Sequence, residues 1–382
     1  MQSTLRANAA RERIGRWLAA PGAPAGLVLT RPAPVAWATG GIAPPVDRSA
    51  DTDLVWAVIT PVGAGLITTE VEADRVAEEY QPAAHGFTEL ATVPWYRPEE
   101  FVRAAEDLAG APAGRLAGDG HPAFAADASD DLIEARLALS GPEQQELRDL
   151  GGDAAAALED ALISWAPGER DLDVQARVAA SLERCGADAP VLIVGGDDRV
   201  RRYRHPMAVG APARGLVMAV VVARRAGLHA AATRFACTGP PPPDLRALRA
   251  RVGRIERDVL AASRPPGSYG QALSALDAGY AREGAAGGWA GHYQGGPIGF
   301  AQREFEIAPC QHDSRWYATR IEAGHAVAWN PSLPGGAKAE DTYLVDPAGM
   351  ERVTTGRAGP AWPVEDGDDV VPPRPAVLEV GR

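Results

Sequence analysis

Two histidines and two glutamates are the side chains of this sequence best suited to proton transfer. His205 stands in the short sequence YRHP, and His292 stands on a glycine-rich turn. Imidazole titrates near neutral pH and can move a proton in either direction. A carboxylate that pairs with such a ring fixes its tautomer and raises its basicity, which makes Glu304 and Glu340 candidate partners. The same residue types are also common in surface ion pairs, so residue type alone leaves both a catalytic and a structural role open.

Other polar side chains near these four could recognise a substrate. Gln294 shares the glycine-rich turn with His292, and the glycines there would let the backbone approach a ligand closely. Asn330, just before a proline, can donate and accept hydrogen bonds without charge. Arg234 and Arg320 could hold a carboxylate through two parallel hydrogen bonds, although structural ion pairs are the commoner use of arginine.

The stretch from Arg214 to Arg234 has the pattern of two core strands, yet it contains no aspartate or glutamate. Divalent cations need donor atoms that valine and alanine side chains do not provide. The remaining histidines show no HExxH or HxxxH spacing, and there is no Walker loop, strand-linked GxGxxG or GxSxG. The sequence therefore predicts neither a metal site nor a bound cofactor.

The composition is that of a folded, acidic protein. Its 382 residues are 46% hydrophobic and 23% charged, and the net charge of −12 disfavours nucleic acid as a partner. Three scattered cysteines predict reduced thiols rather than a disulfide framework. The apolar runs are much shorter than the roughly 20 residues of a membrane span, and no secretory apolar core begins the chain. We expect a cytoplasmic protein with a small-molecule substrate and no membrane partner.

Helical and strand patterns alternate along the first 137 residues, which predicts a small α/β domain over 1–137. Its main expected elements are helices over 8–20, 99–110 and 128–140 and strands over 25–30, 35–40, 53–61 and 114–120. Ser140 and Glu143 then have the spacing of a capping box, so a second domain is expected over 138–382. Its patterns predict long helices, strands between 189 and 239, two more helices, and a strand-rich end. The expected fold class is therefore α/β, used here broadly for a chain of mixed helices and strands that includes the α+β type.

Four motifs follow one another in an order that resembles a known family. They are YRHP, the AATRF that ends at Phe235, the glycine-rich stretch 291–309 and the segment 324–345. The order resembles the pita-bread superfamily of Xaa-Pro aminopeptidases, methionine aminopeptidases and creatinase, the peptidase M24 group. The resemblance covers most of the chain. It implies a creatinase-type N-terminal domain followed by a pita-bread catalytic domain.

The resemblance also places the family's two-metal ligand set on this sequence, and most of that set is missing. The two aspartates fall at Val220 and Ala231, the histidine at Gly296, and the first glutamate at Asn330. Only the last glutamate survives, as Glu340. A hydrolytic site built on a metal-bound hydroxide is therefore not expected in this chain.

The resemblance implies a catalytic role for His205, because creatinase is a metal-free member that uses a histidine. We expect a metal-independent enzyme in which His205 is the general acid and base, acting on a small, carboxylate-bearing substrate by C–N hydrolysis, elimination or isomerisation. A non-catalytic binding protein and a divergent Xaa-Pro aminopeptidase are the alternatives. The resemblance further implies a homodimer, in which Arg48 would close the site of the partner subunit.

Overall fold

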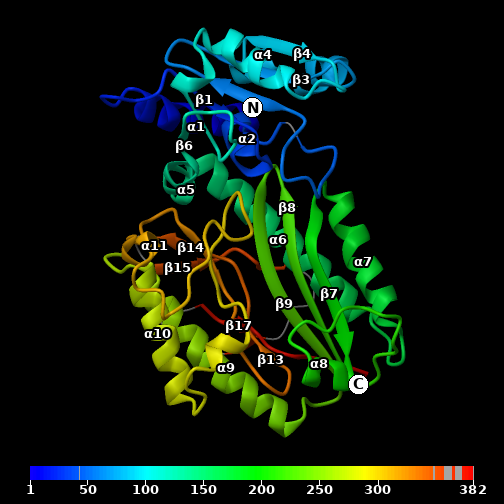
Figure 1. Ribbon diagram of the computed structural model, residues 1–382. Helices are drawn as coiled ribbons and strands as arrows, with labels where there is room; N and C mark the ends of the chain where they lie inside the picture. Colours follow the sequence, from blue (N-terminus) through cyan, green and yellow to red (C-terminus); the bar gives the residue numbers. More distant parts are fainter. Residues whose placement is uncertain (43, 347–348, 357–363, 366–371, 382) are drawn as a thin grey trace. The chain divides into compact units, whose positions relative to one another are not determined.

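The computed structural model describes residues 1–42, 44–346, 349–356, 364–365 and 372–381. The chain divides into two compact units, Met1–Glu143 and Gln144–Arg382 (Figure 1). The sequence placed this boundary after residue 137. The backbone N–H of Ser140 donates to the Glu143 carboxylate at 2.6 Å, which is one half of the predicted capping box at the start of the helix that follows.

The first unit is built on one mixed sheet in the order β4-β3-β2-β1-β5-β6. Its strands are β1 (Gly26–Leu29), β2 (Trp56–Ile59), β3 (Ala64–Thr69), β4 (Glu89–Val93), β5 (Leu116–Gly118) and β6 (Ala126–Asp127). Its helices are α1 (Gln2–Leu18), α2 (Pro32–Thr39), α3 (Ala73–Arg75), α4 (Glu100–Ala109) and α5 (Ser129–Leu137), with short turns η1 (Val76–Tyr80), η2 (Pro82–His85) and η3 (Ala113–Arg115). Trp56, Ile67 and Phe101 pack together between the sheet and α4.

One expected strand of this unit is a helix. Residues 35–40 read as an apolar strand, but they lie in α2. Pro32 is the first residue of α2, where its fixed φ suits a helix and its missing N–H is not needed. Gly40 ends the helix in the left-handed conformation. Because the residues from Pro34 to Thr39 are all buried, the run has no polar face, and its periodicity could not distinguish helix from strand.

The second unit contains a long twisted sheet in the order β18-β9-β8-β7 (Figure 1). Its strands are β7 (Asp188–Gly196), β8 (Leu216–Arg225), β9 (Leu228–Thr238) and β18 (Leu378–Val380). Strands β8 and β9 form the predicted hairpin, and both turn residues, Ala226 and Gly227, have positive φ. Helices α6 (Gly141–Ile163) and α7 (Asp171–Arg184) cover one face of this sheet.

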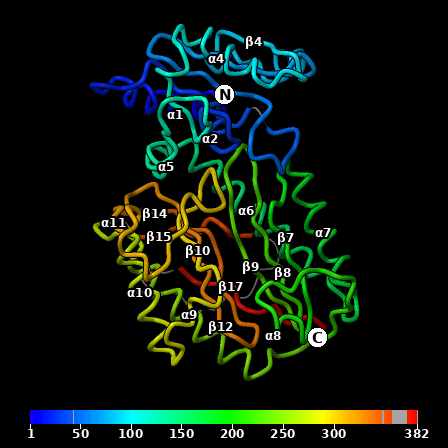
Figure 2. The backbone as a smooth tube through the Cα atoms, in the orientation of Figure 1, coloured from blue at the N-terminus to red at the C-terminus, as the bar shows by residue number. Residues whose placement is uncertain are grey.

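A second sheet in the same unit has the order β10-β11-β14-β15. Its strands are β10 (Gly295–Pro297), β11 (Ala326–Trp329), β14 (Tyr343–Asp346) and β15 (Gly349–Arg352). Helices α9 (Pro243–Ala262) and α10 (Tyr269–Arg282) lie next to it, and Trp329 donates to Ser263, just past α9, at 2.8 Å. Figure 2 shows the segment before β14 beside β9, where the Thr233 N–H donates to the Glu340 carbonyl at 2.9 Å.

Short elements complete this unit between and around the two sheets. They are α8 (Asp197–Arg202), η4 (Gly288–Gly291), α11 (Arg315–Ala318), and the two-stranded pairs β12 (Ser332–Leu333) with β13 (Ala337–Lys338) and β16 (Val364–Glu365) with β17 (Arg374–Pro375). All three cysteines are free thiols. No helix in the described ranges is both long and apolar enough to cross a membrane.

Candidate functional site

The structure brings the two candidate histidines together. His205 follows α8 and His292 follows η4, and their Nε2 atoms lie 3.2 Å apart. The ring centroids are separated by 5.0 Å. Since 87 residues separate them in sequence, only the tertiary fold could place them in contact.

Burial lowers the pKa of both imidazoles. It is the main cause for His205, and the positive charge of Lys338 lowers this pKa further. Burial, then Lys338 and His205, lower the pKa of His292 to about 3. Both rings are therefore neutral near pH 7, and one must donate its Nε2–H to the Nε2 of the other. The Nδ1 of His292 is buried without a hydrogen-bond partner among the described residues.

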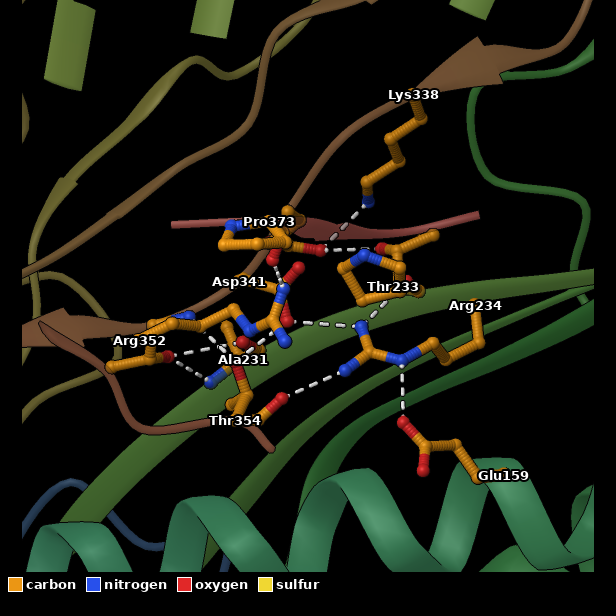
Figure 3. Close-up of polar contacts among 12 residues, drawn as sticks. Glu159, Ala231, Thr233, Arg234, Lys338, Asp341, Arg352, Thr354 and Pro373 are labelled. Atoms are coloured by element: carbon orange, nitrogen blue, oxygen red, sulfur yellow. Dashed lines mark hydrogen bonds and ion pairs between the residues drawn. The ribbon is translucent and has the colours of Figure 1, made fainter. Parts of the chain in front are cut away.

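Glu340 pairs with a lysine rather than with His205. The Lys338 ammonium lies 3.1 Å from the Glu340 carboxylate, and the side chains are 5% and 3% exposed. The Thr233 hydroxyl donates to the same carboxylate oxygen at 2.9 Å (Figure 3). Burial alone would raise the pKa of Glu340, but Lys338 and Arg303 hold it below its ordinary value. The expected hydrogen bond between His205 and a carboxylate is absent from the described part of the chain.

A pocket opens beside this ion pair, between α8 and the β12–β13 hairpin. Its volume is about 420 Å³, counted with the solvent at its mouth. The residues that line it are Val200, Arg201, Arg202, Tyr203, Arg204, Met218, Ser332, Pro334, Gly335, Gly336, Ala337 and Lys338. No acidic side chain belongs to this lining within the described ranges, so its walls are cationic and apolar.

Gln294 and Glu304 hold the loop around His292 and the turn after β10. Gln294 donates to the carbonyls of Trp289 and His292, each at 2.8 Å, and accepts from Tyr280 at 3.0 Å. Glu304 accepts the backbone N–H of Phe300 at 2.7 Å. Both residues thus hold loop backbone in place, while the substrate contact predicted for Gln294 and the histidine pairing predicted for Glu304 stay predictions.

Arg234 lies in a buried polar network on the other side of β9, away from the pocket lining. Its guanidinium donates to Glu159 at 3.0 Å, to Asp341 at 2.9 Å, and to the carbonyls of Thr233 and Thr354 (Figure 3). The side chain is fully buried. These contacts make Arg234 a structural residue, in contrast to the predicted role as a substrate anchor.

The remaining predicted residues divide between the site and other places. Asn330 is buried near the site: its N–H donates to the Gln294 carbonyl at 2.8 Å, and its Oδ1 has no partner among the described residues. Arg320 is exposed and donates to the Pro266 carbonyl at 3.2 Å. Arg48 is exposed on a loop of the first unit. Within the described ranges Arg320 does not contact either histidine, so its predicted role has no support from the geometry.

The side chains present do not fit a pair of divalent metals. Val220 faces Thr233 across the β8–β9 ladder, and Ala231 lies two residues before Thr233 on the same face of β9. Glu340, the one carboxylate left at the family's positions, is bound by an ammonium. No group of three or more His, Cys, Asp or Glu in the described ranges could hold a metal ion. The donor set therefore disagrees with a metal centre.

Sequence reasoning missed Lys338, the residue that binds Glu340. A signal was present, because Lys338 and Glu340 are two residues apart, and alternate residues of an extended segment point to the same face. It also missed Ser332, whose hydroxyl is buried without a partner among the described residues and which lines the pocket. Ser332 lies in a strand of two residues, and so short a sequence has no alternation from which the direction of a side chain could be predicted.

Comparisons with known proteins agree with this architecture. The model of metallopeptidase family M24 matches residues 145–347. No curated protein matches the sequence. Among solved structures, the chain is similar to a Mycobacterium ulcerans dipeptidase PepE (TM-score 0.72, 19% identity, 92% of this chain and 96% of that one). It is also similar to a Bacillus anthracis Xaa-Pro dipeptidase (TM-score 0.70, 19% identity, 93% and 98%).

The chain is similar to the N-terminal domain of the FACT complex subunit SPT16 from Cicer arietinum, with a TM-score of 0.63 and 11% identity over 93% of this chain and 96% of that one. Identities this low establish the shared fold, and the chemistry must be argued from the residues of the site.

Proposed function

Because this chain belongs to metallopeptidase family M24 but carries Val220, Ala231, Gly296 and Asn330 where the resemblance places metal ligands, we propose that it is a metal-independent enzyme of the pita-bread fold. It acts on a small, polar, carboxylate-bearing substrate through proton transfer. The reaction is a C–N hydrolysis, an elimination or an isomerisation. The observation that carries the proposal is the neutral His205–His292 pair beside the Lys338–Glu340 ion pair.

His205 acts first as a general base, since its lowered pKa keeps the ring neutral near pH 7. In the tautomer that suits this role, His205 donates its Nε2–H to the Nε2 of His292 and keeps a free lone pair on Nδ1. When Nδ1 takes a proton from the substrate, the His205 ring becomes positively charged. The hydrogen bond from its Nε2–H to the Nε2 of His292 then stabilises this charge. The return of that proton to a leaving group completes the acid step.

Lys338 supplies the fixed positive charge of the site. Its ammonium is buried and held by Glu340, so it needs no rearrangement to meet an oxyanion that develops during the reaction. Peptide hydrolysis is the most demanding version of the proposal, because no group here generates a hydroxide at neutral pH. Because the similar structures include a prolidase and a Xaa-Pro dipeptidase, proline-containing dipeptides belong among the substrates to test.

One experiment separates catalysis from binding. The protein, dialysed against a chelator, is incubated with Xaa-Pro dipeptides, N-acyl amino acids and guanidino acids, and products are followed by mass spectrometry. We expect turnover of one class, at least a hundredfold less for His205→Ala, and no change for His312→Ala, an exposed histidine near Tyr317. Turnover that survives in His205→Ala, or that needs added metal, would contradict the proposal.

The second candidate function is a non-catalytic receptor for a small ligand or a peptide. It is favoured by one observation: neither imidazole is hydrogen-bonded to a carboxylate in the described part of the chain. In that case no substrate class is turned over, and His205→Ala lowers only the affinity for a ligand, or changes nothing.

A further inference from the structure

We propose that the pocket between α8 and the β12–β13 hairpin is an oxyanion-binding subsite, in which Lys338 and Ser332 donate hydrogen bonds to a carboxylate or phosphate group of the ligand. This inference rests on the proposed function in that the bound group would belong to the substrate. Binding itself can be measured without turnover, however, so the two proposals can fail independently.

Lys338 has donors to spare. An ammonium group carries three N–H bonds. Among the described residues, Glu340 is the side chain that accepts from it, and Lys338 is one of the residues that line the pocket. A buried ammonium whose N–H groups lack acceptors destabilises the protein. An acceptor that enters the pocket therefore gains a charge-assisted hydrogen bond.

Ser332 provides a second donor on the same face. It lies directly opposite Lys338 in the β12–β13 pair, and opposite residues of an antiparallel pair point to one side of the ribbon. Its hydroxyl is buried without a partner of hydrogen-bond geometry among the described residues, and the nearby Tyr280 phenol, whose pKa is raised by burial and partly lowered by this hydroxyl, already donates to the Ser332 carbonyl. A carboxylate or phosphate oxygen can accept from Ser332 and Lys338 together. Its negative charge makes both hydrogen bonds stronger than those to a neutral water molecule.

The charges around the pocket favour an anion. Arg202 and Arg204 line it, and burial lowers the pKa of Arg204. Carboxylates oppose this field: Glu340 pairs with Lys338, Asp244 pairs with Arg201, and Asp198 also acts on Arg201. The cations of the lining, which are Arg201, Arg202, Arg204 and Lys338, outnumber these acids and leave the pocket positive.

The hairpin is preformed for this role. Gly335 and Gly336 have φ values of +101° and +99° at its turn. A Cβ on Gly335 would lie 2.8 Å from a Leu248 methyl group, and one on Gly336 would lie 3.2 Å from Val200. The close approach fixes the turn against α8 and α9 and thereby holds Ser332 and Lys338 at the pocket.

The test is isothermal titration of the full chain with sodium phosphate and, separately, sodium acetate, against sodium chloride at constant ionic strength. We expect saturable binding of at least one oxyanion and none of chloride. Ser332→Ala should weaken it about tenfold to a hundredfold, as the loss of one hydrogen bond to a charged group predicts. The order of affinity for phosphate and acetate identifies which oxyanion the pocket prefers.

Lys338→Met would leave Glu340 buried without its partner, so the double variant Lys338→Met with Glu340→Gln removes both charges. We expect it to bind at least about tenfold more weakly. Arg16→Met with Glu12→Gln, which removes an exposed ion pair of α1 in the first unit, is the charge-matched control and should bind as the wild type does. Equal losses in the two double variants, or no saturable binding by the wild type, would overturn the inference. Oxyanion binding without any turnover would leave it standing and remove the enzyme proposal instead.

Discussion

Two groups of buried charges in the second unit are each held together by a side-chain cation. Lys338, Glu340 and Thr233 form one group, and Arg234 with Glu159 and Asp341 forms another. In both groups a side-chain cation satisfies the carboxylates. The first group faces the pocket, whereas the second joins β9 to α6 and to the segment before β14.

Replacing Arg234 with methionine should destabilise the fold rather than weaken substrate binding. The change leaves Asp341 and Glu159 without their cation, and breaking a buried pair from one side costs about 3–5 kcal/mol. Urea unfolding followed by circular dichroism measures the loss. Arg320→Met, which removes an exposed arginine, should change the free energy of unfolding by less than about 0.5 kcal/mol. A stable Arg234→Met protein that has lost only ligand affinity would support the earlier substrate-anchor hypothesis.

At the scale of elements, the β12–β13 hairpin positions the lysine and serine of the pocket. Gly335→Ala should cost about 1–3 kcal/mol, because an alanine there has a left-handed φ and meets Leu248 at 2.8 Å. Gly168→Ala has a similar positive φ of +94° but nothing within 4 Å, so it should cost less. Thermal unfolding compares the two variants. Equal losses would mean that the close approach to α9 does not matter.

Several elements could be predicted from the sequence because their pattern is local. The β8–β9 hairpin has strong strand residues and a two-residue turn, and α9 and α10 have clear helical periodicity. The helix α2 could not be identified because its short apolar run is buried on all sides.

The candidate site was less predictable, for a physical reason. His205 and His292 could be named by residue type, but their contact depends on how α8 and η4 pack. The carboxylate partner expected for His205 was wrong because Lys338, nearer to Glu340, takes that carboxylate. Strands β12 and β13 have two residues each, and a shift of one residue in their register would turn the other side chains toward the pocket. A two-residue pattern in the sequence is too short to predict that register.

At the scale of the whole molecule, buried histidines make stability depend on pH. Burial lowers the pKa of His229 to about 4, and its Nδ1 contacts the Gly299 carbonyl at 3.2 Å. The unfolded chain binds this proton near pH 6.5, so the contribution of His229 is fully present above pH 6.5 and is lost as pH falls toward 4. The difference in unfolding free energy between the wild type and His229→Gln should therefore shrink between pH 7 and 4.5. A difference that stays constant across this range would contradict the prediction.

The homodimer proposal can be tested on the same scale. Light scattering should give twice the 40.0 kDa of one chain. If Arg48 closes the site of the partner subunit, Arg48→Gln and His205→Ala proteins should each be inactive and should regain on the order of a quarter of the activity when mixed, because half of the dimers then contain one complete site. A monomeric mass, or no recovery on mixing, would remove Arg48 from the site.

The most direct test of the account is a metal-binding measurement. The purified protein is incubated with Mn²⁺, Co²⁺, Zn²⁺ and Fe²⁺ in turn, passed through a desalting column and analysed by mass spectrometry of the elements, beside the Glu340→Gln variant. The account predicts that almost no metal is retained and that the variant behaves in the same way, since Lys338 already neutralises Glu340. One or two equivalents held by the wild type and lost in Glu340→Gln would contradict it.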